Sequence, residues 1–174
     1  MSSDREEIIQ VINLYGLAVD TQDFDLFDRI FTSDIVARYS ESAHWAGLDN
    51  FKRDFVGYHR PFDGTQHIMF NHLVDVKDDE ATCVTYAHWR LYRKGVPGGD
   101  FWEGNGWYDD HAVRVGEGWR IDRRACRIIW WGGNPLVSQA DPSVTFDLPI
   151  TSLRAERERG RLGFYNAIQG RAIK

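Results

Sequence analysis

The sequence predicts an α+β fold in which three N-terminal helices pack against a curved, mostly antiparallel sheet. Two observations support this fold class. Residues 4–58 carry apolar side chains at helical spacing, whereas residues 67–131 alternate in the manner of long strands separated by short Gly- or Asp-rich turns. A run of helices followed by a run of strands is typical of α+β architecture. At 174 residues the chain is long enough for one domain with a full core.

The N-terminal third is predicted to be mainly helical. Ser3 and Glu6 form a capping box ahead of the first helix. Asp23 is expected to cap a second, shorter helix whose apolar face is mostly aromatic. The expected order is helix, helix, strand and helix, over residues 4–20, 24–31, 35–40 and 47–58.

Strands dominate the next part of the chain and give way to an irregular C-terminal arm. We expect residues 1–131 to form the domain and residues 132–174 to form the arm, with a terminal helix at about 151–168. The sequence leaves three alternatives open for the arm: that it covers the mouth of a pocket, that it lies on a neighbouring subunit, or that it is mobile. Four strands are expected, over residues 67–76, 81–93, 100–115 and 119–131.

Composition narrows the class of protein. A net charge of −5 without a basic stripe argues against a nucleic-acid binder. The charged N-terminus lacks a signal core, and no stretch approaches the roughly 20 apolar residues of a membrane span. We therefore expect a cytoplasmic protein that binds neither nucleic acid nor membrane. Cys83 and Cys126 are expected to be buried thiols.

Polar side chains occur within the predicted strand at residues 67–76. A histidine or asparagine on an apolar strand face must find a hydrogen-bond partner or face a cavity. Strict alternation divides the segment into two faces. One face is expected to hold His67, Met69, Asn71 and Leu73, and the other Ile68, Phe70, His72 and Val74.

Several short motifs, taken in order and spacing, resemble the SnoaL-like group of proteins related to nuclear transport factor 2. The resemblance covers about residues 4–131 and implies a cone-shaped fold. The group includes scytalone dehydratase, bile-acid 7α-dehydratase, hexachlorocyclohexane dehydrochlorinase, steroid isomerase and polyketide cyclases. The matching motifs are Tyr15 to Asp25, Phe31 to Ile35, Gly64 to His67, Asn71 with His72, and Gly118 to Ile121.

The resemblance implies a catalytic pair at Asp20 and His67. Dehydratase-like members pair an Asp at the end of the first helix with a His at the start of the long hairpin. A carboxylate bonded to one ring nitrogen fixes the tautomer and leaves the other nitrogen as a general base. The alternative is that Asp20 caps the next turn while His67 is a satisfied core histidine.

Further site residues are expected around this pair. Tyr15 matches a position that holds a catalytic Tyr or Lys in some members, although packing in the core is the alternative. Alternation must send an arginine of the last strand inward, and the resemblance favours Arg124 or Arg123. His88 resembles a second catalytic histidine of scytalone dehydratase. The expected substrate contacts are Asn71, Met69, His88, Tyr86 and Trp102.

Together these features predict a lyase that needs no cofactor. Neither metal-ligand spacing nor a Gly-rich nucleotide-binding turn is present in the sequence. The chain's 14% aromatic content suggests a pocket for a hydrophobic, aromatic or polycyclic molecule. Loss of water, halide or formaldehyde needs the same base. The alternatives are an isomerase, a polyketide cyclase or a non-catalytic subunit, and a homo-oligomer, dimer or trimer, is expected.

Overall fold

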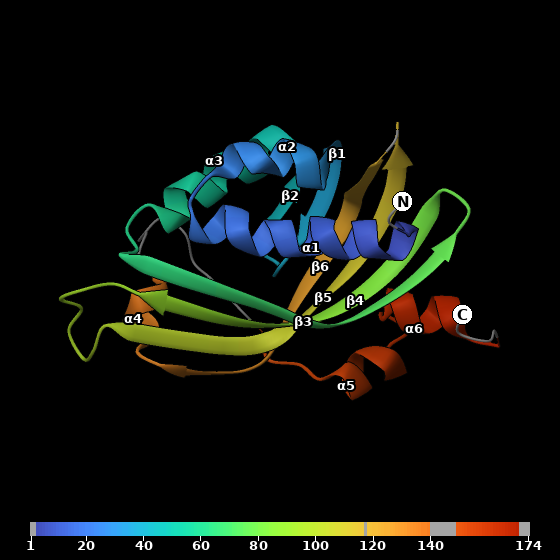
Figure 1. Ribbon diagram of the computed structural model, residues 1–174. Coiled ribbons are helices and arrows are strands. Elements are labelled where there is room, and N and C mark those ends of the chain that lie inside the picture. The colour runs from blue at the N-terminus through green and yellow to red at the C-terminus, as the bar shows by residue number, and fades with distance from the viewer. Residues whose placement is uncertain (1–2, 117, 140–148, 171–174) are drawn as a thin grey trace.

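A computed structural model of the protein describes residues 3–116, 118–139 and 149–170. The predicted helices and strands occur in the predicted order (Figure 1), and the structure adds β2 (His44–Ala46) and α4 (Pro135–Ser138), which were not predicted. The N-terminal part contains α1 (Asp4–Asp20), the 3-10 helix η1 (Phe24–Leu26), α2 (Phe27–Ile30), β1 (Phe31–Arg38), β2 (His44–Ala46) and α3 (Leu48–His59). The remainder contains β3 (Gly64–Lys77), β4 (Glu80–Tyr92), β5 (Phe101–Val115), β6 (Gly118–Gly133), α4 (Pro135–Ser138), α5 (Leu153–Glu158) and α6 (Gly163–Ile168).

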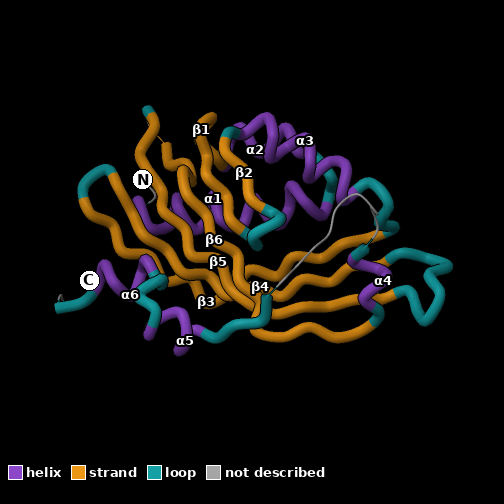
Figure 2. The backbone as a smooth tube through the Cα atoms, turned by 180° about the vertical axis from the view of Figure 1, so that it is seen from behind, coloured by secondary structure: helices purple, strands orange, loops and turns teal. Residues whose placement is uncertain are grey.

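One six-stranded sheet organises the fold, in the order β2-β1-β6-β5-β4-β3. β1 and β6 are parallel, and the other neighbouring strands are antiparallel. Helices α1, α2 and α3 lie on one face, and α5 and α6 lie on the opposite face (Figures 1 and 2). The predicted α+β class with a mostly antiparallel sheet is confirmed. We call the two sides the inner and the outer face.

The helix termini follow the predictions only in part. The capping box is present, because Ser3 Oγ accepts from the Glu6 N–H and Glu6 accepts from the Ser3 N–H. The prediction for Asp23 is wrong, since its side chain makes no capping hydrogen bond. The second helix is split into η1 and α2, and β1 begins at Phe31, four residues before the predicted strand.

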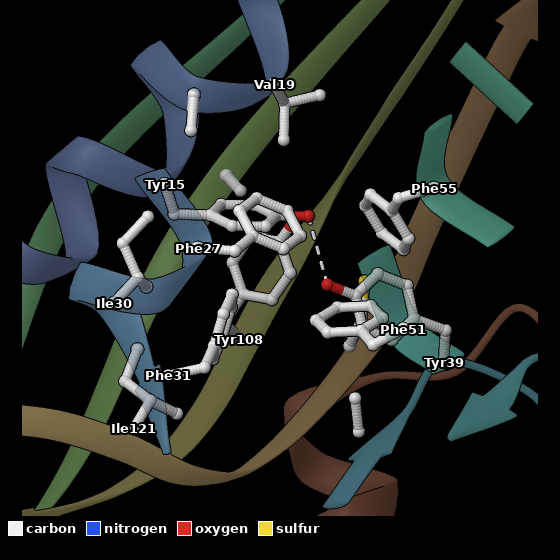
Figure 3. Packing of buried hydrophobic residues seen from close by; sticks show 14 of the residues in the cluster. Tyr15, Val19, Phe27, Ile30, Phe31, Tyr39, Phe51, Phe55, Tyr108 and Ile121 are labelled. Atoms are coloured by element: carbon white, nitrogen blue, oxygen red, sulfur yellow. Dashed lines mark hydrogen bonds between the residues drawn. The ribbon is translucent and has the colours of Figure 1, made fainter. Parts of the chain in front are cut away.

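The main core lies between the helices and the inner face of the sheet. Aromatic rings from α1, α2, α3 and β1 meet there (Figure 3). Phe27 lies 5.7 Å from Tyr15 and 5.5 Å from Phe51 between ring centroids, and Phe51 lies 4.5 Å from Phe55. Many of the aromatic residues noted in the sequence are therefore core residues, and burying each contributes about 1.5–3 kcal/mol.

A smaller cluster on the outer face anchors the C-terminal arm. Leu162 and Phe164 pack there against Val84 and Trp107. The single helix predicted at 151–168 is instead two short helices, α5 and α6, and Gly160 between them has a positive φ of 66°. A glycine in that conformation ends a helix at little steric cost. The part of the arm at residues 140–148 lies outside the described residues.

A β-bulge in β3 changes which residues share a face. Phe70 pairs with Tyr86 but Leu73 pairs with Val84, so β3 contains one extra residue, and Asn71 has a φ of 51°. The predicted faces are therefore wrong from Asn71 onward. Val74 enters the main core, whereas Leu73 is exposed, because the inserted residue reverses the alternation.

Cys83 and Cys126 are buried and form no disulfide, as predicted. Among the described residues, no helix is long and apolar enough to cross a membrane.

Candidate functional site

Asp20 and His67 are in direct contact. The His67 Nδ1 and Asp20 Oδ1 atoms lie 2.7 Å apart, and the second carboxylate oxygen accepts from the His67 backbone N–H at 2.8 Å. Thr65 also donates its hydroxyl to Oδ1 over 2.9 Å. Because an ionised carboxylate only accepts, Nδ1 carries a proton and Nε2 keeps a lone pair in the neutral ring. This geometry is that of an oriented general base.

The surroundings of Asp20 favour its ionised form. Burial raises the pKa of this carboxyl, but the hydrogen bonds and charge of His67 and the bond from Thr65 outweigh burial, so the net pKa is lowered. The side chain of His67 is only 6% exposed, compared with 24% for Asp20. The pair therefore has one side toward solvent and the other, at His67, within the protein.

The close packing of α1 on β3 sets the position of this pair. Gly16 lies one turn before Asp20, and a Cβ added there would lie 3.1 Å from the His67 carbonyl oxygen and 3.5 Å from Met69 Cγ. A side chain at this position would therefore push the helix away from the strand. Gly16 allows the end of α1 to approach the start of β3.

His67 lines a small cavity on the inner face. Its volume is about 70 Å³, which is enough for a few water molecules but below the roughly 300 Å³ of ordinary ligand sites. Aromatic side chains occupy much of the space, so a polycyclic molecule would fit only if some of them moved, whereas a single ring makes a smaller demand. The cavity is lined by Tyr15, Tyr39, Phe55, Tyr58, His59, His67, Trp89, Leu91, Trp102, Tyr108, Cys126 and Ile128.

Two phenols at the wall of this cavity form a hydrogen-bonded pair. The hydroxyls of Tyr15 and Tyr39 lie 3.0 Å apart (Figure 3). Burial raises the pKa of Tyr15 to about 12, although the charge of Arg124 opposes this shift. Tyr15 is therefore a neutral donor or acceptor at physiological pH. Tyr108 also hydrogen-bonds Tyr15, so three phenol hydroxyls are linked at the cavity wall.

Arg124 points into the interior, and Arg123 does not. The Arg124 guanidinium binds both carboxylate oxygens of Asp110, at 2.8 and 2.7 Å, and lies 4.3 Å from the ring centroids of Tyr15 and Tyr108. The side chain of Arg123 is 61% exposed. Arg124 is not among the residues that line the cavity, so it stands behind the phenols and contacts Tyr15 rather than the cavity itself.

His59 at the end of α3 is a cavity residue that the sequence reasoning missed. Its Nδ1 atom lies 2.8 Å from the Phe55 carbonyl oxygen, and its ring lies 6.3 Å from that of His67. Burial, together with the charge of the nearby His67, lowers the pKa of His59 to about 3. This side chain is therefore neutral at physiological pH. Its helical position gave no sign in the sequence that it would face His67.

The expected substrate contacts divide between the two faces. Trp102 lines the cavity, and Met69 packs beside Gly16 and the core. Tyr86, His88 and Asn71 do not line this cavity. Tyr86 stacks on Phe70, and His88 Nε2 lies 2.9 Å from Glu103 Oε2, both on the outer face. Asn71 is exposed, because it occupies the bulge.

Three phenols beyond Tyr15 line the cavity and were also missed. Tyr39 follows β1, Tyr58 belongs to α3, and Tyr108 lies on β5. The inward face of β5 was the one detectable signal, since Trp102, Tyr108 and Asp110 are an even number of residues apart. Tyr39 and Tyr58 reach the site through tertiary packing, which periodicity does not encode.

No metal site is evident in the part of the chain that the structure describes. Among residues 3–116, 118–139 and 149–170, no three His, Cys, Asp or Glu side chains are grouped to hold an ion. The polar atoms at the cavity are two imidazoles, several phenols, two indoles and one thiol. Burial raises the pKa of the Cys126 thiol to about 12, so it is neutral. The arrangement is suited to proton transfer.

Comparison with known proteins identifies the family. Residues 1–125 match the family model described as a SnoaL-like domain. The uncharacterized protein Rv2910c of Mycobacterium tuberculosis is 33% identical over 132 residues, which cover 70% of this chain and 83% of that protein. The Kfla4162 protein from Kribbella flavida superposes with a TM-score of 0.73 at 24% identity, covering 78% of this chain and 97% of its own.

A scytalone dehydratase-like protein from Novosphingobium aromaticivorans is also similar in structure. Its TM-score is 0.68 at 22% identity, over 74% of this chain and 86% of that one. At such identities the structural likeness shows the fold, whereas the match over residues 1–125 shows the family. The chain therefore belongs to the SnoaL-like family, and its fold is that of the nuclear transport factor 2-like superfamily.

Proposed function

We propose that the protein is a cofactor-independent lyase that removes a proton from a small hydrophobic, aromatic molecule and releases a small fragment. The observation that carries this proposal is the 2.7 Å contact between Asp20 and His67, with the ring at the wall of an aromatic cavity. Among the described residues, no hydrogen bond or ion pair reaches His67 Nε2. The scytalone dehydratase-like neighbour supports the same class of reaction.

In the proposed elimination, His67 Nε2 takes a proton from carbon. The electron pair of that C–H bond becomes the second bond of the new double bond, as the bond from the adjacent carbon to its leaving group breaks. For an alcohol, the imidazolium returns its proton to the departing oxygen, so the products are an alkene and water. Asp20 stabilises the imidazolium, and a phenol hydroxyl at the cavity wall, that of Tyr15 or Tyr39, donates a hydrogen bond to the leaving oxygen.

The small volume of the cavity limits the size of the proposed substrate. A volume of about 70 Å³ excludes a polycyclic molecule unless lining side chains move. We therefore favour a compact, single-ring substrate, whose entry displaces one of the aromatic side chains at the wall. Loss of water, of halide or of formaldehyde remains consistent with the Asp20 and His67 geometry alone.

A non-catalytic binding module is the second candidate, and the small size of the cavity favours it. That candidate predicts a cavity filled by the protein's own side chains, and also that Asp20 and His67 do not touch. The second expectation is not met, since the pair is in contact. Isomerase and cyclase reactions would use the same base and differ from elimination in their products.

A product screen distinguishes these candidates. The wild-type protein is incubated with single-ring alcohols, β-hydroxy ketones and their halide analogues in the presence of a chelator, and products are identified by mass spectrometry. We expect turnover that survives chelation and falls about 100-fold or more in Asp20→Asn. Circular dichroism checks that the variant is folded. Binding without turnover by the wild type would support the module instead, and loss of turnover on chelation would contradict a cofactor-independent reaction.

A further inference from the structure

His59 is a buried histidine whose protonation is set by the backbone of its own helix. It is 4% exposed, and its Nδ1 lies 2.8 Å from the Phe55 carbonyl oxygen one turn earlier in α3. A carbonyl oxygen only accepts, so Nδ1 carries the proton. In the neutral ring, the proton on Nδ1 leaves Nε2 with a lone pair. The second nitrogen is therefore restricted to the role of acceptor.

This acceptor has no partner in the described structure. Within residues 3–116, 118–139 and 149–170, no group donates a hydrogen bond to His59 Nε2, and the side chain lines the same cavity as His67. The neighbouring rings are those of Phe24, Phe55 and Phe62, which offer no donor, and those of Tyr58 and His67. His59 Nε2 is not among the fully buried atoms that lack a partner, in keeping with its place at the cavity wall. A ligand that fills the cavity takes the place of water beside this acceptor, so it binds more tightly if it supplies a hydrogen-bond donor.

Two causes keep the ring neutral. Burial is the largest, and the charge of His67 acts in the same direction, so the pKa of His59 is lowered to about 3. The bond to Phe55 and the carboxylate of Asp20 oppose this but do not prevail. Because the imidazole is such a weak base, it does not take the substrate proton. It can only accept a hydrogen bond.

We propose that His59 Nε2 binds a hydroxyl group of the substrate and makes the site selective for alcohols or phenols over the corresponding halides and ethers. This inference rests on the proposed function, because it assigns a substrate class to the same cavity. A halide in place of the hydroxyl would leave the His59 lone pair buried and unpaired. Among the eliminations considered above, the proposal retains loss of water and formaldehyde and disfavours loss of halide.

Phenol and fluorobenzene provide a matched pair of probes. The two molecules have nearly the same shape and differ in the hydroxyl donor, and a single ring makes the smallest demand on a cavity of about 70 Å³. We expect phenol to bind the wild-type protein at least about tenfold more tightly by calorimetry. Equal affinities, or no detectable binding of phenol at millimolar concentration, would overturn the proposal.

Variants assign the preference to His59 rather than to His67, which also presents a lone pair. His59→Leu is expected to lose most of the preference for phenol. His67→Leu, the matched control in the same cavity, is expected to retain it, and so is His59→Gln, which keeps an acceptor oxygen. A preference that survives unchanged in folded His59→Leu would show that another group binds the hydroxyl.

A measurement on the unaltered protein covers the case in which His59→Leu does not fold. In protein labelled with ¹⁵N-histidine, we expect phenol to shift the Nε2 resonance of His59 and fluorobenzene to leave it in place. An Nε2 resonance that responds to neither probe would contradict the proposal. Because these experiments measure binding, they can succeed even if no substrate is turned over, so failure of the lyase proposal is seen separately in the product screen.

Discussion

Asp20 joins the end of α1 to the start of β3 through three hydrogen bonds at 2.7, 2.8 and 2.9 Å. The partners are the side chain and backbone of His67 and the hydroxyl of Thr65. The bond to the His67 backbone N–H holds the start of β3 against the end of α1. The bonds to the His67 ring and the Thr65 hydroxyl fix the orientation of the Asp20 carboxylate. This redundancy orients the imidazole before any substrate is present, which is what a general base requires.

The first prediction concerns acid stability. Since the net pKa of Asp20 is lowered on folding, its carboxylate stabilises the fold above its unfolded pKa of about 3.9, and this contribution is lost as the pH falls below that value. We expect Asp20→Asn to lower the free energy of unfolding by about 1–3 kcal/mol at pH 7. In urea titrations the difference from wild type should shrink below pH 4. A constant difference down to pH 3 would contradict the assignment.

The second prediction concerns the contribution of His59 to stability, which changes at higher pH than that of Asp20. A histidine with a folded pKa of about 3 is neutral in the fold but protonated in the unfolded chain below pH 6.5. Acidification from pH 6.5 therefore favours unfolding, by at most about 1.4 kcal/mol per pH unit from this residue. His59→Gln should lose this part of the pH dependence between pH 6.5 and 5 in urea titrations. The same slope in both proteins would show that His59 is not buried in its neutral form.

At the scale of elements, the contact between α1 and β3 decides whether Asp20 reaches His67. Two helical glycines provide a matched test. A Cβ on Gly16 would lie 3.1 Å from the His67 carbonyl oxygen, whereas a Cβ on Gly57 in α3 would meet nothing within 4 Å. The first position therefore controls the distance between helix and strand, and the second one does not.

The third prediction follows from this contrast. Gly16→Ala should move α1 outward by a few tenths of an ångström and lower turnover about tenfold or more, because catalysis is sensitive to small misplacement. Gly57→Ala should leave turnover unchanged and raise stability by up to about 1 kcal/mol, since alanine favours helix. Both effects are measured with purified variants by turnover and by thermal unfolding. Equal turnover in the two variants would show that the helix contact is not limiting.

Some elements of the fold could be predicted from the sequence and others could not. The long strands, the first helix and the Asp20 and His67 contact could be predicted, because periodicity and the family motifs mark them directly. The bulge at Asn71 could not, since one inserted residue leaves no compositional mark but reverses the alternation beyond it. Tyr86 and His88 are two residues apart and therefore share one face of β4. Alternation alone did not show that this was the outer face, away from the cavity.

At the scale of the whole molecule, the sheet separates the candidate site from helices α5 and α6 of the C-terminal arm (Figures 1 and 2). The cavity lies on the inner face, and α6 covers part of the outer face through Leu162 and Phe164. Part of the outer face remains apolar and exposed at Ile68, Phe70 and Trp130. We propose that this surface contributes to a homo-oligomer, a dimer or trimer, which light scattering would detect.

The fourth prediction tests the role of the arm. Phe164 is 5% exposed and packs in the same cluster as Trp107, whereas its neighbour Tyr165 is 37% exposed. Phe164→Ala should destabilise the arm by about 3 kcal/mol or more and allow water to reach Trp107, which would shift tryptophan fluorescence to longer wavelength. Tyr165→Ala should change neither quantity appreciably. An unchanged spectrum in Phe164→Ala would show that the arm does not protect Trp107.

The turnover of His67→Ala relative to wild type tests the central claim most directly. The substrate is the compound that the wild-type protein converts in the product screen, and the folded state of the variant is checked by circular dichroism. We predict that folded His67→Ala forms product about 100-fold more slowly or not at all, because the base is gone while Asp20 and the cavity wall remain. Turnover equal to wild type would contradict the assignment of His67 as the base and, with it, the proposed mechanism.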